Sequence, residues 1–301
     1  MATFLADLER SYELVMNPPT SDGATKFLDD LRRVYACISA PPFEFDHRGL
    51  DALFRKMRNH CKISLKERIE ELSEQDPDNP CFGHVSLFGS MDLGRWETAH
   101  TNFLAWLFDP NQPHGFGSSI IAAVLNGLDD DNADFNQEGI RVINSCSEHY
   151  VSDAETSGRI DVWVEGRIAV SKIPWLLVIE AKIEASLGDG QLKKYDSRIT
   201  QWKTGKPNAR VFKLLLTHDL NSDDYADRSG WKIWDYQKLV SIIWSSGRHH
   251  VDAPGYHLLR YYLTGVLSDV IGWKLPLTQD TEDPYNALIY SSALMGERGH
   301  K

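Results

Sequence analysis

The chain has 301 residues, 42% of them hydrophobic and 25% charged, and a formal net charge of −11. This composition is typical of a folded globular protein and excludes a low-complexity chain. The negative charge argues against a protein that coats nucleic acid without specificity, because phosphate backbones are bound through excess Lys and Arg. The first ten residues contain acids where a secretory leader has bases. The four cysteines are widely spaced, which is typical of free thiols in a reducing compartment. No apolar stretch is long enough to span a bilayer. These features predict a cytoplasmic protein with no membrane partner.

The first 80 residues are predicted to form a helical region. Apolar residues recur at helical spacing in residues 3–16, 24–39 and 47–75, and prolines interrupt the pattern at positions 41–42 and 77–80. Apolar stripes of this kind usually serve packing. We therefore expect these helices to pack or to contact a partner, and they leave open a homo-oligomer or a protein partner bound through them.

A second helix is predicted for residues 92–108. Its apolar side is formed by Trp96, Phe103, Leu104, Trp106 and Leu107. Glu97, His100 and Thr101 are spaced i, i+3, i+4, so they share one face of this helix. A glycine-containing loop follows at 114–117, and residues 118–128 are expected to form a short helix.

The remaining segments alternate between strands and helices. Residues 141–155 and 159–166 are predicted to form a hairpin that turns at Ser157 and Gly158. Strands are expected at 175–182, 211–217 and 231–234, and helices at 191–202, 236–246 and 255–271. This order predicts an α/β fold, with a mixed central sheet flanked by helices. We expect an N-terminal helical region (1–80), this α/β domain (85–275) and a C-terminal tail (276–301).

Two neighbouring strands of this domain each carry a carboxylate. Asp161 lies on the first and Glu180 on the second, at the end of an otherwise apolar run. Strand side chains alternate faces, so Glu180 and Lys182 point the same way and Ala181 points to the other side. Charge in such a setting is costly unless it is paired. We therefore expect Asp161 and Glu180 to converge on one Mg²⁺ or Mn²⁺, with the Ala181 carbonyl as a further oxygen ligand.

Lys182 is suited to phosphodiester chemistry beside such a cation. Its ammonium can hold or deprotonate a water, or neutralise charge that develops on a phosphate. The alternative is an inert surface ion pair, which is the usual outcome for Glu-x-Lys on a strand. Residues 172–213 carry nine Lys or Arg and four Asp or Glu, a local charge of +5 in an acidic chain. This segment is either a solvated helix face or a surface for a phosphate backbone.

The pattern of Asp161 followed by Glu180-Ala181-Lys182 resembles the core of the PD-(D/E)XK nuclease superfamily, although Ile160 stands where that motif has proline. Gln191 and Tyr195 match the Q-x-x-x-Y element of its RecB-like branch, and Glu97 lies in a helix similar to the opening helix of a bacterial subgroup. The resemblance covers residues 92–217 and implies a restriction-endonuclease-like core. It implies that Asp161 and Glu180 bind metal and that Lys182 positions the attacking water. It further implies that Glu97 holds the metal through water or orients Lys182, while Gln191 and Tyr195 line the site.

The sequence does not decide the roles of several neighbouring residues. His100 is a candidate extra metal ligand, with a structural role equally open, and the same two interpretations apply to His114. Arg159 can pair with a carboxylate or reach a phosphate. The candidate nucleic-acid contacts are Arg159, Lys193, Lys194 and Arg198.

The leading hypothesis is a nuclease dependent on Mg²⁺ or Mn²⁺ that acts on DNA, with RNA not excluded. A stand-alone nuclease of this type is expected to serve defence against foreign DNA, restriction or repair. One alternative is a non-catalytic binding module that keeps the nuclease fold. Another is a helical interaction protein in which the α/β part is a scaffold.

Overall fold

The fold was analysed in a computed structural model, which describes residues 70–71, 73–129, 135–152, 157–184, 187–188, 190–218 and 230–273. All of these residues lie in the second of the two units into which the chain divides, Cys61–Lys301. The helices predicted over 3–16 and 24–39, most of the third helix and the tail after Trp273 lie outside the described residues. The end of the third helix, residues 70–71 and 73–75, is helical.

A five-stranded mixed sheet forms the centre of the described part. Its strands follow one another in sequence order: β1 (Ile140–Ser152), β2 (Ser157–Ile168), β3 (Pro174–Lys182), β4 (Arg210–Thr217) and β5 (Lys232–Asp235). The β1–β2 and β2–β3 pairs are antiparallel, whereas β3–β4 and β4–β5 are parallel. The predicted mixed sheet flanked by helices is therefore confirmed.

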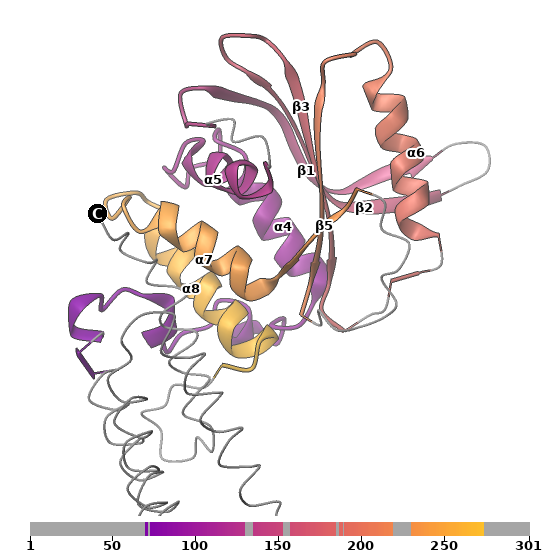
Figure 1. The fold of residues 1–301 in the computed structure, drawn as a ribbon. Coiled ribbons are helices and arrows are strands. Elements are labelled where there is room, and N and C mark those ends of the chain that lie inside the picture. The colour runs from indigo at the N-terminus through magenta and orange to yellow at the C-terminus, as the bar shows by residue number, and fades with distance from the viewer. Residues whose placement is uncertain are drawn as a thin grey trace, which may run out of the picture. The chain divides into compact units, whose positions relative to one another are not determined.

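Helices cover both faces of this sheet (Figure 1). On one face lies α6 (Gln191–Lys203). On the other lie α4 (Glu97–Leu107), α5 (Ser119–Leu128), α7 (Tyr236–Gly247) and α8 (Tyr256–Gly265). Alternate residues of β3 enter the two cores: Leu176 and Val178 pack with α6, and Leu177 and Ile179 pack with the other helices. The apolar run of β3 follows from this arrangement, because a strand covered on both faces has no solvent side.

The helix predicted for 92–108 begins later than expected. A short 3₁₀ turn, η2 (Gly89–Met91), precedes it, Asp92 has a left-handed φ of 59°, and α4 starts only at Glu97. Trp96 is the residue before the helix and is 59% exposed, so its assignment to the apolar side was wrong. A helix cannot pass through a left-handed residue without losing its hydrogen-bond ladder, which is why the turn separates the two segments.

Two smaller differences concern the hairpin and the last helix. Ser157 and Gly158 belong to β2, where they pair with Ser152 and Val151, so the prediction that the hairpin turns at these two residues was wrong. Strand pairing here outweighs the local turn preference of Ser-Gly. The helix expected at 255–271 is α8 followed by a π-helical turn, η4 (Val266–Val270). Within the described ranges, none of the helices is long and apolar enough to cross a membrane.

Candidate active site

The predicted site residues gather where β2 and β3 stop pairing. The last pair of this ladder is Val162 with Ile179, so Asp161 is the first residue of β2 beyond it. Its Oδ2 accepts the backbone N–H of Ala181 at 2.8 Å. Ile160 packs with α6, whereas Val162 packs on the opposite side of the sheet. Residues two apart in a regular strand share a face, so β2 departs from regular alternation at Asp161.

Glu180 and Lys182 form a buried ion pair on the α6 side of β3. Lys182 Nζ lies 2.7 Å from Glu180 Oε1, and Glu180 is fully buried. The same Oε1 accepts a hydrogen bond from Gln191 Nε2 at 2.6 Å. The period-two alternation thus does bring the carboxylate and the ammonium together, with Ala181 buried on the other side of the strand.

Gln191 and Tyr195 connect Glu180 to β2 through a chain of hydrogen bonds. Gln191 Nε2 donates to Tyr195 Oη at 2.7 Å, and Tyr195 Oη donates to the Arg159 carbonyl at 2.6 Å. Gln191 Oε1 accepts the N–H of Gly188 at 3.1 Å. The two side chains lie four residues apart on α6 and therefore on one face. This chain fixes the Glu180 carboxylate relative to Asp161, two residues after Arg159.

The sequence around α6 explains why Gln191 reaches the site. Gly190 precedes the helix with a φ of 66°, a conformation that costs a residue with a Cβ about 1–2 kcal/mol. Three residues then anchor the helix on the sheet at helical spacing: Leu192, Tyr195 and Ile199 are buried. Charged residues occupy much of the remaining surface, as expected for an amphipathic helix over a sheet.

Glu97 approaches the end of β3 from the other face of the sheet. It lies in the first turn of α4, and its Oε1 accepts the N–H of Ile183 at 2.7 Å and that of Glu184 at 3.4 Å. Arg95 forms an ion pair with Glu184. Glu97 therefore holds the backbone immediately after Lys182.

The electrostatics of the site follow from burying three like charges beside one ammonium. Burial, followed by the charge of Asp161, raises the pKa of Glu180 to about 8, against the opposing effect of Lys182. Burial also raises the pKa of Asp161. Burial alone would lower the pKa of Lys182, but Glu180, Asp161 and Glu97 outweigh it and hold that pKa above its ordinary value. The metal-free site therefore retains a proton on its carboxyl pair near neutral pH.

The carboxyl pair fits a hard divalent cation. Glu180 Oε2 is buried and has no hydrogen-bond donor among the described residues. No three His, Cys, Asp or Glu side chains cluster within that part of the chain to form a complete metal site. Two carboxylates and one main-chain carbonyl suit Mg²⁺ or Mn²⁺, because such ions keep several waters as ligands. Asp161, Glu180 and the Ala181 carbonyl thus offer a fitting donor set.

The two candidate histidines make main-chain contacts instead. His114 is buried, its Nε2 lies 2.9 Å from the Asp109 carbonyl, and its Nδ1 accepts the N–H of Phe116 at 3.0 Å. Both nitrogens are therefore used, which favours the structural role for His114. His100 is buried with Nε2 at 2.9 Å from the Gly94 carbonyl, while its Nδ1 has no partner among the described residues. Its ring packs edge-on against Phe88.

Sequence reasoning missed Tyr236, the first residue of α7. Its side chain is fully buried, and its hydroxyl has no hydrogen-bond partner in the described part of the chain. Burial, the neighbouring Tyr262 and then the charges of Glu97, Asp161 and Glu180 raise its pKa. The hydroxyl is therefore within electrostatic reach of the three carboxylates. Only its position after Asp235, which caps α7 by accepting the N–H of Lys238, distinguishes it in the sequence.

The four candidate nucleic-acid contacts have different surroundings. Lys193 and Lys194 are exposed on α6. Arg198 is half-buried, with its guanidinium 5.8 Å from the centre of the Trp163 ring and a hydrogen bond to Gln201. Arg159 forms an exposed ion pair with Glu148 at 2.6 Å.

Comparison with known proteins agrees with this geometry. Residues 87–262, more than half of the chain, match the family model described as the PD-(D/E)XK nuclease superfamily. The chain belongs to the PD-(D/E)XK nuclease superfamily, and the predicted family is confirmed.

Individual relatives add little to this assignment. Among solved structures, the chain is similar to the MspJI restriction endonuclease in complex with a 27-mer oligonucleotide, at 15% sequence identity and a TM-score of 0.24. That alignment covers 64% of this chain and 39% of that chain, so this chain matches well under half of the restriction endonuclease. No curated protein matches the sequence.

Proposed function

We propose that the protein hydrolyses phosphodiester bonds in DNA and depends on Mg²⁺ or Mn²⁺. The observation that carries this proposal is the 2.7 Å contact between Lys182 Nζ and the buried Glu180 carboxylate, beside Asp161 at the open end of the β2–β3 ladder. An inert pair would be expected at the surface, where it costs little. A buried ammonium between carboxylates is costly, which favours a function for the cluster.

The residues that would hold the cation are Asp161, Glu180 and the Ala181 carbonyl. When bound there, a divalent cation would polarise the scissile phosphate and lower the pKa of a water. Lys182 Nζ would donate a hydrogen bond to the attacking water or to a phosphate oxygen, and its positive charge would stabilise the negative charge of the transition state.

The surrounding residues would keep these groups in position. Gln191 holds Glu180 Oε1 at 2.6 Å, and Tyr195 ties that contact to β2. Glu97 holds the Ile183 N–H, and thereby the backbone that follows the Ala181 carbonyl and Lys182. Preorganisation of this kind contributes to catalysis because a small misplacement of the reacting groups costs much of the rate.

Cleavage assays test the proposal directly. Supercoiled, linear and single-stranded DNA and RNA would each be incubated with the full chain in Mg²⁺, in Mn²⁺ and in EDTA. We expect metal-dependent DNA cleavage that is lost in Lys182→Ala. Lys172→Ala is the matched control, because it removes an exposed lysine from the β2–β3 turn. If RNA is cleaved while DNA stays intact in both metals, the proposed substrate is refuted. If no substrate is cleaved in either metal, the proposed activity is refuted.

We further propose a cytoplasmic role in defence against foreign DNA. The support is that nucleases of this superfamily often serve defence, together with the free Cys81 and Cys146, which suit a reducing compartment. Phage plating on cells that express the wild type or Glu180→Gln tests this role. Equal plating efficiency on the two strains across a broad phage panel would count against defence.

A further inference from the structure

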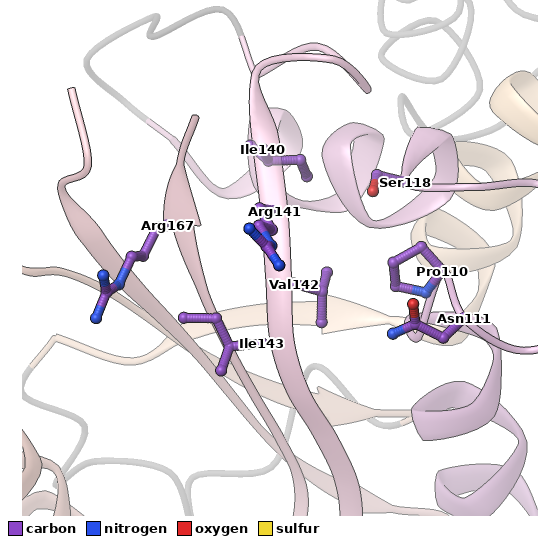
Figure 2. Close-up of a pocket in the computed structure, with 8 residues that line it drawn as sticks. All are labelled: Pro110, Asn111, Ser118, Ile140, Arg141, Val142, Ile143 and Arg167. Atoms are coloured by element: carbon purple, nitrogen blue, oxygen red, sulfur yellow. The ribbon is translucent and has the colours of Figure 1, made fainter. Parts of the chain in front are cut away.

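A pocket of about 420 Å³ lies at the edge of the sheet, along β1 and beside the connection from α4 to α5 (Figure 2). Its lining residues are Pro110, Asn111, Ser118, Ile140, Arg141, Val142, Ile143 and Arg167. Arg167 and Asp161 are six residues apart on β2, which corresponds to about 20 Å of extended strand. The pocket is therefore separate from the candidate active site.

Two arginines of the pocket are neighbours on adjacent strands, and within the described residues neither is paired with an acid. Arg141 and Arg167 are direct partners in the antiparallel β1–β2 ladder, and both are exposed. Within the described residues neither forms an ion pair with a carboxylate. Like charges placed directly opposite each other destabilise a sheet. An anion at this position would remove that cost.

Polar residues of the connection from α4 to α5 line the other side of the pocket. Figure 2 shows Arg141 between Arg167 on one side and Ser118 and Asn111 on the other. Ser118 is the residue before α5, is 9% exposed and makes no capping hydrogen bond with its side chain. Its hydroxyl makes no hydrogen bond within the described part of the chain and borders the pocket on the α5 side.

Asp109, the residue before Pro110, already accepts hydrogen bonds from its own turn. Asp109 Oδ1 accepts the N–H of Asn111 at 3.0 Å and its Nδ2 at 2.9 Å, and Oδ2 accepts Gln112 Nε2 at 2.9 Å. Asn111 keeps one amide hydrogen for a ligand. The positive end of α5 adds to the preference for an anion, although the two guanidinium groups carry the argument.

We infer that this pocket binds a phosphate group through the guanidinium groups of Arg141 and Arg167. Guanidinium groups match the tetrahedral oxygens of phosphate because their planar N–H donors bind two oxygens at once. The phosphate can belong to the backbone of a bound nucleic acid, in which case the inference rests on the proposed function. It can also be free phosphate or that of a nucleotide. The separation of about 20 Å between Asp161 and Arg167 corresponds to about six base pairs of duplex, since each base pair rises about 3.4 Å. The bound phosphate would therefore lie about six base pairs from the scissile bond.

Binding experiments without divalent metal distinguish these sources and are independent of cleavage. Inorganic phosphate would be titrated calorimetrically into the full chain. Fluorescence anisotropy would measure the binding of a 6-base-pair and a 30-base-pair duplex. These lengths are roughly too short and long enough to span the distance from the active site to the pocket. The test variant is Arg141→Ala/Arg167→Ala, which removes two exposed side chains. Arg141→Lys/Arg167→Lys keeps the charge without the guanidinium geometry, and Arg248→Ala removes an arginine from the end of α7.

Each outcome has a defined meaning. For a backbone phosphate, the double alanine variant binds the long duplex roughly tenfold more weakly, with a salt slope lower by about two, while the short duplex is unaffected. For free phosphate, phosphate binding falls at least roughly tenfold and duplex binding is unchanged. The lysine variant shows a smaller loss in either case, and Arg248→Ala shows none. Wild-type affinities for all three probes in the double alanine variant, with its thermal unfolding unchanged, overturn the inference whether or not the chain is a nuclease.

Discussion

The Asp161 carboxylate accepts the Ala181 N–H at 2.8 Å, immediately beyond the last ladder pair of β2 and β3. Beyond the point where the two strands separate, the Asp161 side chain therefore accepts the Ala181 N–H in place of a backbone carbonyl of β2. The contact places the carboxylate of one strand beside Glu180 of the next, and it keeps Asp161 in position without a cation.

This relationship predicts different effects for two substitutions of Asp161. Asp161→Asn keeps an oxygen that can accept the Ala181 N–H, so its unfolding free energy is expected to stay near that of the wild type, whereas Asp161→Ala loses about 1–3 kcal/mol. Both variants lack the carboxylate and are expected to cleave DNA at least roughly a hundredfold more slowly. Urea denaturation and initial cleavage rates check the two expectations. Wild-type rates in Asp161→Asn would remove Asp161 from the catalytic group.

The raised pKa of Glu180 predicts that the metal-free protein loses stability as pH rises. Burial holds this pKa at about 8 in the folded protein, against 4.5 for an unperturbed carboxyl. The folded state therefore binds more protons than the unfolded state between these values, and the unfolding free energy falls across that window. Below pH 4.5 both states carry the proton, and the stabilising contribution is complete.

Denaturation curves from pH 4 to pH 9 in EDTA test this pH dependence. Glu180→Gln cannot ionise and is expected to flatten the curve between roughly pH 5 and pH 8. Added Mg²⁺ is expected to flatten the wild-type curve as well, because a cation that binds only the folded state replaces the proton. An equally steep fall in Glu180→Gln would assign the dependence to another group.

The bonds made by Gln191 predict that α6 positions Glu180 for catalysis. Gln191→Ala removes the 2.6 Å donor to Glu180 and the contact with Tyr195. A hydrogen bond to a charged group contributes about 1.5–3 kcal/mol, so cleavage is expected to slow by roughly 10- to 100-fold, mainly in kcat. Ser197→Ala is the control, because this position is exposed on the same helix and its hydroxyl donates to the Lys193 carbonyl within that helix. A change in KM with kcat unchanged would indicate substrate binding instead.

His100 is predicted to stabilise the fold without binding the metal. Its Nε2 is occupied by the Gly94 carbonyl, and its ring packs among Phe88, Tyr236 and Tyr262. Truncating a buried ring leaves a cavity, so His100→Ala is expected to lose about 3 kcal/mol of stability. Calorimetry with Mn²⁺ at a temperature where the variant is folded is expected to give the wild-type affinity. A weaker Mn²⁺ affinity with unchanged stability would restore the ligand role.

Local pattern was sufficient for part of this site and insufficient for the rest. The alternation of a strand placed Glu180 and Lys182 on one face, and the helical spacing placed Gln191 beside Tyr195, because both depend on neighbours within a few residues. The contact of Glu97 with Ile183 joins residues 86 apart, and Tyr236, whose pKa these carboxylates raise, lies on a helix beyond β5. Such contacts depend on how α4 and α7 pack over the sheet, which no local spacing encodes. The start of α4 was missed for a related reason: the left-handed Asp92 belongs to a turn whose Gly94 carbonyl bonds to His100 within the helix.

Glu97 combines a backbone contact with a charge, and two substitutions separate them. Glu97→Gln keeps an oxygen for the Ile183 N–H, so its stability is expected to match the wild type, whereas Glu97→Ala loses about 1–3 kcal/mol. Both variants remove one of the negative charges that raise the pKa of Lys182. That pKa is therefore expected to fall, and the alkaline limb of the pH–rate profile moves to lower pH in both variants. If the Glu97→Gln profile superimposes on the wild type while Glu97→Ala is unstable, Glu97 acts through the backbone alone and its charge plays no part in the reaction.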